Sequence, residues 1–325
     1  MKQVLIFLLI ASVFFTCKKG PSNTKLSGDV FGTSYSVIYD KDVDYTKSFD
    51  SLFAVINTSL STYIPDSDIS KINRNESNSI DDHFITVFNA SKVIYNNTQG
   101  AFDPTIGVVV NAWDFGPQGK IVALDSLKID SLMQYVGFDK VNRVDNKILK
   151  LKGAFIDFNA IAKGYGVDVI ANFLEQKKVD NYLVEIGGEI RSKGINAEKD
   201  SNWKVGLDQP RFDGEQSILK AISIKDEAMA TSGTYRKFKV DENGNKYAHI
   251  IDTKTGYPSK TNVLSVSVIA KDCMTADAYA TAFQAMGIEG VKDFLQSHPE
   301  LKAFLIFEND KNEFETLNLN GFPEE

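Results

Sequence analysis

The stretch from Ala154 to Lys178, AFIDFNAIAKGYGVDVIANFLEQKK, places a short apolar strand, a turn of small residues and a helix in immediate succession. We expect the strand over 154–158, the turn over 159–166 and the helix over 167–178. The helix ends in basic residues, which the negative end of a helix dipole favours. Strand patterns follow directly, around a Gly-Gly turn, over 182–186, 189–194 and 203–207.

Helix and strand patterns continue on both sides of this stretch without the strict alternation of a βαβ protein. The apolar residues of 46–60 recur at helical spacing and predict an amphipathic helix, whereas 263–270 alternates and predicts a half-buried strand. Mixed elements of this kind predict an α+β fold. The other expected elements are two short strands within 30–39, loops over 66–82 and 100–119, helices over 84–96, 275–286 and 290–297, two short strands within 136–151, and strands over 218–224, 301–307 and 314–319.

The composition is that of a folded, acidic protein. The chain has 325 residues, of which 43% are hydrophobic, enough for one large domain or for two lobes with their own cores. Its 36 basic and 43 acidic residues give a net charge of −7, which argues against nucleic acid as a partner, because phosphate binding needs a basic surface. Three His and two Cys are too few for a Cys/His zinc module.

The N-terminus predicts a lipoprotein signal peptide over residues 1–16. A single lysine precedes an almost entirely apolar run over 4–15, which is too short to span a bilayer but suits the core of a signal peptide. Cys17 follows a small residue, as in a bacterial lipobox; ordinary cleavage with Cys17 as an incidental thiol is the alternative. We expect an exported protein, anchored on the periplasmic side of a membrane by a lipid on Cys17, with a tether over 17–25 and a body over 26–325.

Two groups of residues suggest sites for a cation and for phosphate. Asp277 and Thr281 are four residues apart on an expected helix, so a carboxylate and a hydroxyl share one face, as a hard-oxygen pair suited to Mg²⁺. Lys163 lies in the turn before the helix of 167–178, where free backbone N–H groups and an ammonium together suit phosphate. The turn is neither a Walker A loop nor G-x-G-x-x-G. Each group also has an interpretation without a ligand. Asp277 and Thr281 fit a solvated aspartate and a threonine bonded to its own helix, and the turn with Lys163 fits an ordinary strand-to-helix connection.

A histidine and an aromatic loop complete the candidates. His249 lies in an apolar strand with Asp252 three residues later; it suits a general base near neutral pH, or a histidine satisfied within the core. The loop from Gly100 to Gly107, followed by Trp113, sets an aromatic ring beside a carboxylate. That arrangement suits a planar heterocycle, or an ordinary buried loop. Taken singly, none of these groups identifies a ligand.

Several short motifs between Phe31 and Met286 have the same order and similar residues as the motifs of one known family. They are Phe31-Gly32-Thr33-x-Tyr35, Ser61 to Ser70, Gly100 to Gly107 with Trp113, Asp157 to Asp168, Tyr182 to Ile190, Ala230 to Tyr235, His249 to Pro258 and Asp272 to Thr281. Together they resemble the ApbE family of FAD:protein FMN transferases. The signal peptide and lipobox are also similar to those of many members.

The resemblance implies a two-lobed α+β body with FAD in the cleft and Mg²⁺ beside it. The family usually has Met where Phe31 stands, which implies an altered but still apolar contact with the isoalloxazine ring. The implied metal ligands are the carbonyl of Ala160, Asp277 and Thr281, with the carbonyl of Ala280 nearby. The implied FAD contacts are Phe31, Tyr63, Ala101, Phe102, Asp103, Asp157, Lys163 and the strand over 249–251, including Ile251.

The reaction that the resemblance implies is transfer of FMN from FAD to a Thr or Ser hydroxyl of an acceptor flavoprotein, with release of AMP. His249 would act as the base, and Asp252 would orient it. The acceptor would be a subunit of a membrane redox complex, within reach of the lipid anchor on Cys17. Two other functions fit the same residues: an FAD pyrophosphatase that uses water as acceptor, and a flavin-binding lipoprotein without catalysis.

Overall fold

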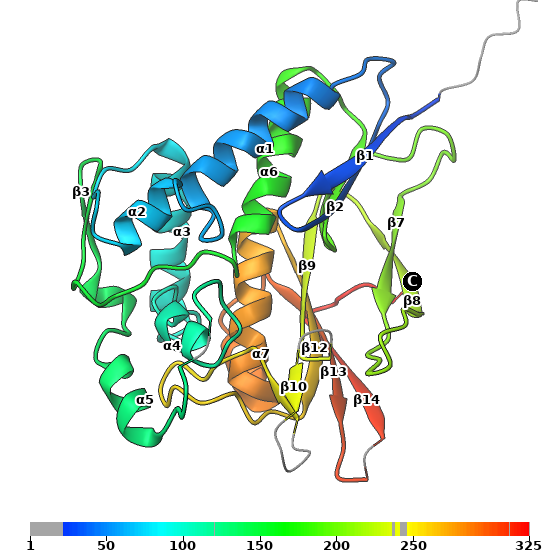
Figure 1. Ribbon diagram of the computed structural model, residues 1–325. Coiled ribbons are helices and arrows are strands. Elements are labelled where there is room, and N and C mark those ends of the chain that lie inside the picture. The colour runs from blue at the N-terminus through cyan, green and yellow to red at the C-terminus, as the bar shows by residue number, and fades with distance from the viewer. Residues whose placement is uncertain (1–21, 120, 236–237, 241–245, 312, 325) are drawn as a thin grey trace, which may run out of the picture.

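The computed structural model describes residues 22–119, 121–235, 238–240, 246–311 and 313–324 (Figure 1). The expected signal peptide and the expected lipidation site, Cys17, lie outside the described residues. Within the described part of the chain, no helix is both long and apolar enough to cross a membrane. Thr24 and Lys25, at the end of the expected tether, already belong to the first strand.

One eight-stranded antiparallel sheet runs through the molecule (Figure 1). In sheet order its strands are β1 (Thr24–Val30), β2 (Thr33–Tyr39), β5 (Tyr182–Ile186), β6 (Glu189–Lys193), β9 (Ala228–Gly233), β12 (Val263–Ala270), β13 (Lys302–Glu308) and β14 (Phe314–Leu319). The N-terminal hairpin therefore forms one edge and the C-terminal hairpin the other. All of β12 is buried, so the strand expected over 263–270 is correct in extent and wrong in being half-buried.

Different elements cover the two faces of the sheet, which explains the burial of β12. Helices α6 (Ala162–Gln176) and α7 (Cys273–Leu295) lie along one face (Figure 1). The hairpin of β7 (Trp203–Asp208) and β8 (Ile218–Ile224) covers the other. There Trp203 packs in an apolar cluster with residues of β6, β9, β12 and β13.

A second group of helices, with one small hairpin, lies on the side of α6 and α7 away from the sheet (Figure 1). They are α1 (Thr46–Leu60), α2 (Asp68–Asn73), α3 (Asp82–Asn97), α4 (Gly107–Ala112), α5 (Ser126–Met133), the 3-10 helix Phe138–Lys140, β3 (Asn142–Val144) and β4 (Lys147–Leu149). Helix α1 contacts α6, and α3 contacts α7, over a shared apolar core. A separate hairpin consists of β10 (Phe238–Val240) and β11 (Lys246–Ala248).

Most of the expected elements are confirmed. Those confirmed to the residue are the helix over 46–60 and the strands over 182–186, 218–224, 263–270 and 314–319. The loops expected over 66–82 and 100–119 are wrong in part, because they contain the six-residue helices α2 and α4. Helices of fewer than two turns show too little of a hydrophobic period to be recognised. Helix α6 begins at Ala162 rather than at 167.

The strand expected over 154–158 is wrong, because this extended segment pairs with a side chain and a loop instead of a strand. The amide of Asn73 donates to the Ile156 carbonyl oxygen and accepts from the Ile156 N–H, each at 2.8 Å. The N–H of Asp157 donates to the carbonyl oxygen of Pro104 at 2.8 Å. These partners are far away in the sequence, so no local pattern could reveal them.

Helices α6 and α7 meet at a contact that only glycine permits. A Cβ atom on Gly164 would lie 2.4 Å from the carbonyl oxygen of Cys273. One turn later on α6, the buried carboxylate of Asp168 accepts hydrogen bonds from the N–H groups of Cys273 (3.0 Å) and Met274 (2.8 Å) and from Arg191 Nη1 (2.9 Å). It thereby satisfies donors that have no partner inside α7. The two contacts fix where α7 begins relative to α6.

Helix α7 is interrupted at Gly287, whose φ of 69° and ψ of 178° are not helical. The interruption separates the two helices that we expect over 275–286 and 290–297. Glycine adopts a positive φ at little cost. The part of α7 before Gly287 is the part that carries the candidate cation residues.

We expect Gly164→Ala to destabilise the protein by about 1–3 kcal/mol or more, because the new methyl group pushes the backbones of α6 and α7 apart. Gly290→Ala is a matched control on α7. Its Cβ would meet the side chain of Met286 instead of another helix, so it should cost less. Urea unfolding of both variants measures the two losses. Equal stability of Gly164→Ala and wild type would contradict the close approach.

The stability contributed by Asp168 should depend on pH. Burial raises the pKa of Asp168 from 3.8 to about 6, against the N–H groups and Arg191, which lower it. Between pH 3.8 and about pH 6, the folded protein therefore binds a proton that the unfolded chain has lost. The free energy of unfolding falls as pH rises through this interval. The free energy of unfolding of wild type minus that of Asp168→Asn should fall by about 2–3 kcal/mol across the interval and level off above it. Urea unfolding at several pH values measures this, and a constant difference would contradict it.

Candidate functional site

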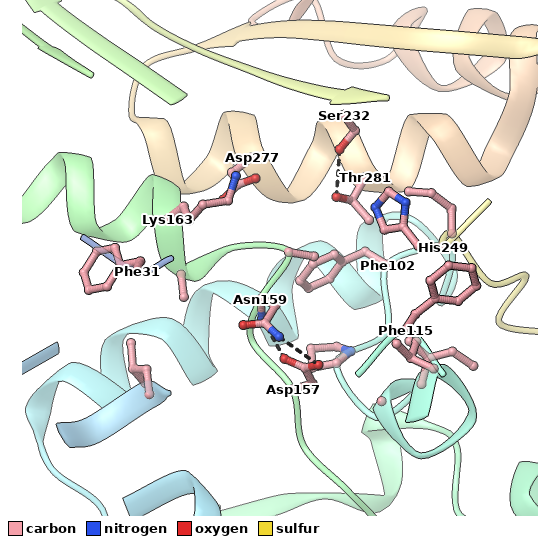
Figure 2. Close-up of a pocket in the computed structure, with 18 of the residues that line it drawn as sticks. Phe31, Phe102, Phe115, Asp157, Asn159, Lys163, Ser232, His249, Asp277 and Thr281 are labelled. Atoms are coloured by element: carbon pink, nitrogen blue, oxygen red, sulfur yellow. Dashed lines mark hydrogen bonds between the residues drawn. The ribbon is translucent and has the colours of Figure 1, made fainter. Parts of the chain in front are cut away.

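A cavity of about 910 Å³ lies between α7 and the start of α6 on one side and α1 and α4 on the other (Figure 2). This volume suits a ligand of cofactor size. Of the expected site residues, those that line it are Phe31, Tyr63, Ala101, Phe102, Asp103, Asp157, Ala160, Lys163, His249, Ile251, Asp277 and Thr281. Ala280 is fully buried and Asp252 lines a neighbouring hollow, so these two are not in the cavity wall.

Charged groups gather at the start of α6. Lys163 Nζ lies 2.6 Å from Glu189 Oε1, and the Glu189 side chain is only 3% exposed. The N–H of Gly164, which belongs to the first turn of α6, donates to Asp277 Oδ2 at 2.9 Å. Asp277 therefore caps α6 from α7, where the positive end of the helix dipole favours a carboxylate.

Burial dominates the ionisation of these groups. It raises the pKa of Glu189 to about 7, although the ammonium of Lys163 opposes the shift. It also raises the pKa of Asp277, against Lys163 and the N–H of Gly164. For Lys163, burial lowers the pKa, but the two carboxylates outweigh it and the net shift is upward. One ammonium thus faces two buried carboxylates, which leaves this end of the cavity short of positive charge when both are ionised.

The oxygen donors here fit a magnesium ion. Asp277 and Thr281 line the cavity from one face of α7, and Thr281 Oγ1 lies 3.0 Å from Ser232 Oγ (Figure 2). Ala160 lines the wall just before α6. Glu189 Oε2 is buried and has no hydrogen-bond partner among the described residues. Mg²⁺ is held in this way, by one or two carboxylates together with substrate phosphates, and keeps several waters. Within the described residues, no three His, Cys, Asp or Glu side chains form a metal-binding group.

His249 points into the cavity near Thr281 (Figure 2). The strand expected around it is wrong in part: β11 ends at Ala248, and Ile251 forms an isolated bridge with Pro258. The ring of Phe115 lies edge-on to His249, with the ring centroids 6.2 Å apart. His249 therefore combines a partly apolar setting with access to the cavity.

Asp252 belongs to the turn that follows His249. Its carboxylate accepts hydrogen bonds from the N–H groups of Lys254 (2.8 Å) and Thr255 (3.1 Å). Its own N–H donates to the carbonyl oxygen of Tyr257 at 2.8 Å. These bonds give Asp252 a role in shaping the loop, and its orientation of His249 stays a prediction.

An aromatic residue in an unusual backbone conformation forms another part of the wall. Phe31 and Gly32 make the two-residue turn between β1 and β2, both with positive φ (50° and 74°). Such a φ is uncommon for a residue other than glycine. The ring of Phe31 packs edge-on against Phe53, with a centroid distance of 5.5 Å, and fills the space beside Gly166. The turn thus holds an apolar ring at the cavity.

The remaining acidic residues of the wall are engaged locally. Asp157 accepts from the N–H and the side-chain amide of Asn159, at 2.9 and 3.2 Å (Figure 2). Asp103 accepts from the N–H and hydroxyl of Thr105, at 2.7 and 2.6 Å, and burial raises its pKa. Phe102 is buried beside it, whereas Tyr63 is 58% exposed at the cavity. These residues offer aromatic surface and acceptors suited to a planar ring.

Sequence reasoning missed two members of the site. Glu189 lies within a stretch that resembles the family, but nothing in its local pattern marks it as buried in a cavity. Ser232 lies in the stretch from Ala230 to Tyr235 that resembles the family, and only the fold brings it to Thr281. A carboxylate directly after a Gly-Gly turn is the one signal that could have drawn attention to Glu189.

Comparison with known proteins gives consistent matches along the chain. The model of the ApbE family matches residues 31–305. An FAD:protein FMN transferase from Vibrio cholerae is 35% identical over 301 residues, which are 89% of each chain. One from Haemophilus influenzae is 34% identical over 335 residues, 98% of this chain and 96% of that protein.

Solved structures match equally well. The flavin transferase ApbE from Vibrio cholerae has a TM-score of 0.81 and 32% identity, covering 92% of this chain and 97% of that chain. The apo flavinyl transferase ApbE from Pseudomonas stutzeri has a TM-score of 0.81 and 26% identity, covering 92% and 95%. The similarity therefore spans both the sheet and the cavity wall.

Proposed function

The chain belongs to the ApbE family and is a flavin transferase, and on this premise we propose that it moves the FMN half of FAD to a Thr or Ser hydroxyl of an acceptor flavoprotein and releases AMP. The observation that carries the proposal is one cavity that collects Lys163, Asp277 and His249. An ammonium, a candidate cation ligand and a candidate base are the groups that splitting a pyrophosphate requires.

Binding of FAD would use both the charged and the aromatic residues of the cavity wall. The ammonium of Lys163, in the first turn of α6, suits the negatively charged pyrophosphate. Phe31, Phe102 and Tyr63 suit the planar rings at the two ends of FAD. Packing of both rings would exclude water from the phosphate that reacts and hold it at one place in the cavity.

The transfer step needs a base for the acceptor hydroxyl. We assign this role to His249, which takes the proton as the hydroxyl oxygen forms a bond to the phosphorus of the FMN half. The bond between that phosphorus and the oxygen of AMP breaks, and AMP leaves with its phosphate. The energy of the pyrophosphate drives the reaction, so no separate nucleotide is consumed.

A divalent cation, Mg²⁺, fits the same end of the cavity. Asp277, Thr281 and the carbonyl of Ala160 would hold it. The carbonyl of Ala280 would lie nearby, because Ala280 is buried behind the cavity wall. When bound, the cation would neutralise negative charge that develops on the pyrophosphate oxygens.

We also propose where the protein lies in the cell, from the sequence of its N-terminus. We infer a signal peptide over 1–16 and a lipid on Cys17, both outside the described residues. The enzyme would then be exported and anchored on the periplasmic side of a membrane, where the subunits of a membrane redox complex are natural acceptors. FAD carries its own energy, which suits a compartment without ATP.

His249→Ala should lower the rate of adduct formation by about 10²–10⁴-fold, the usual contribution of a general base. Intact mass spectrometry of a candidate acceptor subunit, incubated with FAD and Mg²⁺, measures it as a gain of FMN minus water. His298→Ala is the control, because His298 stacks on Phe294 outside the cavity. An unchanged rate for His249→Ala would contradict the assignment. Free FMN and AMP without an adduct from any acceptor would favour the pyrophosphatase.

Removal of the cation should stop turnover while leaving FAD binding measurable. We expect EDTA, or Asp277→Asn, to reduce AMP release at least 10²-fold. Asn can still accept the N–H of Gly164, so α6 keeps its cap. Asp293→Asn, an exposed position on the same helix, is the matched control. Full AMP release in EDTA would contradict the metal, and FAD binding without turnover in the wild type would favour a pure binding protein.

A further inference from the structure

We propose that Glu189 is a positioning residue of this site: one of its oxygens holds the ammonium of Lys163, and the other accepts a hydrogen bond from a water molecule bound to the divalent cation. The inference rests on the proposed function, from which it takes the cation. It adds a residue that ties the cation and the lysine to one carboxylate and so sets their spacing.

The backbone around Glu189 delivers its carboxylate into the cavity. Glu189 is the first residue of β6, directly after Gly187 and Gly188, whose φ values are 62° and 102°. A Cβ on Gly187 would lie 2.8 Å from the side chain of Thr33, so the turn is tight as well as strained for other residues. The N–H of Gly188 donates to Glu185 Oε1 at 2.7 Å, which holds the turn from β5.

The two oxygens of Glu189 have different surroundings. Oε1 lies 2.6 Å from Lys163 Nζ. Oε2 is buried and has no hydrogen-bond partner among the described residues, although Glu189 lines the cavity. A buried acceptor without a donor costs free energy, and such acceptors are rare in folded proteins. Oε2 therefore suits a hydrogen-bond donor that arrives with the ligands.

A water on the cation is the donor that the surroundings favour. Asp277, a proposed ligand, lines the same cavity as Glu189. Mg²⁺ keeps several of its waters when few protein groups bind it. Residues that accept hydrogen bonds from the ligands of a metal typically change its affinity by 10–100-fold. If Glu189 only neutralised Lys163, Oε1 would be explained and Oε2 would stay without a partner.

The test measures cation binding without any turnover. Mn²⁺, which favours the same oxygen ligands, is titrated into the flavin-free full chain, and free Mn²⁺ is read by electron paramagnetic resonance, with Mg²⁺ as competitor. We expect Glu189→Gln to weaken binding by about 10–100-fold. Glu189→Asp keeps the charge but shortens the reach, and should also weaken binding several-fold. Glu315→Gln removes the same charge at an exposed position of the same sheet, outside the cavity wall, and should stay within about threefold of wild type.

A second comparison separates the cation from the lysine. Lys163→Gln removes a positive charge near the cation, so it should leave Mn²⁺ binding unchanged or strengthen it. If Lys163→Gln weakens binding as much as Glu189→Gln, Glu189 acts only through the lysine and the inference is overturned.

Other outcomes are equally decisive. Asp277→Asn loses a proposed ligand and serves as the control for the cation site. If Asp277→Asn binds Mn²⁺ weakly and Glu189→Gln binds it with wild-type affinity, the inference is overturned. Wild-type affinity in Glu189→Asp shows that charge alone matters and overturns the positioning role. Failure of the wild-type chain to bind Mn²⁺ even with FAD present contradicts the cation of the proposed function, and this inference with it. Melting curves show whether each variant folds. If one of the two Glu189 variants does not fold, Mn²⁺ binding by the other tests the inference.

Discussion

The position of the site depends on the close approach of α7 to the start of α6. Gly164 has no side chain, so the backbone of α7 reaches α6 at a distance that a methyl group would prevent. The same approach lets Asp277 cap the first turn of α6. Because Asp168 holds the first N–H groups of α7 in turn, each helix satisfies donors of the other. The part of the cavity wall that carries Lys163 and Asp277 therefore takes its geometry from the packing of two helices.

This constraint also gathers the chemistry. The helix start brings Lys163, the carboxylate that caps it brings a candidate cation ligand, and Thr281 follows one turn later on α7. The opposite wall supplies aromatic rings at Phe31 and Phe102, and His249 approaches from the loop after β11. Phosphate groups, cation and base thus meet where two helices and the sheet converge, while apolar rings define the rest of the cavity. Such a division suits a dinucleotide, which is charged in its middle and aromatic at both ends.

The sequence predicts much of this because long periodic segments carry their own signal. The helix over 46–60, the strands over 218–224 and 263–270, and the i, i+4 pair of Asp277 and Thr281 all follow from local spacing. The failures have a different origin. The segment 154–158 is apolar and extended, yet its partners are a side chain of α2 and a loop carbonyl far away in the sequence. Glu189 and Ser232 become site residues only through contacts between distant segments, which no local pattern contains.

We propose that the cavity holds the pyrophosphate of FAD between Lys163 and a cation at Asp277. The most direct measurement is a crystal structure of the protein with FAD and Mn²⁺, in which anomalous scattering locates the cation. We expect an anomalous peak between Asp277, Thr281 and the pyrophosphate oxygens, with Lys163 on the phosphate and His249 facing the phosphorus of the FMN half. A flavin bound outside this cavity, or a cation peak away from Asp277, would contradict it.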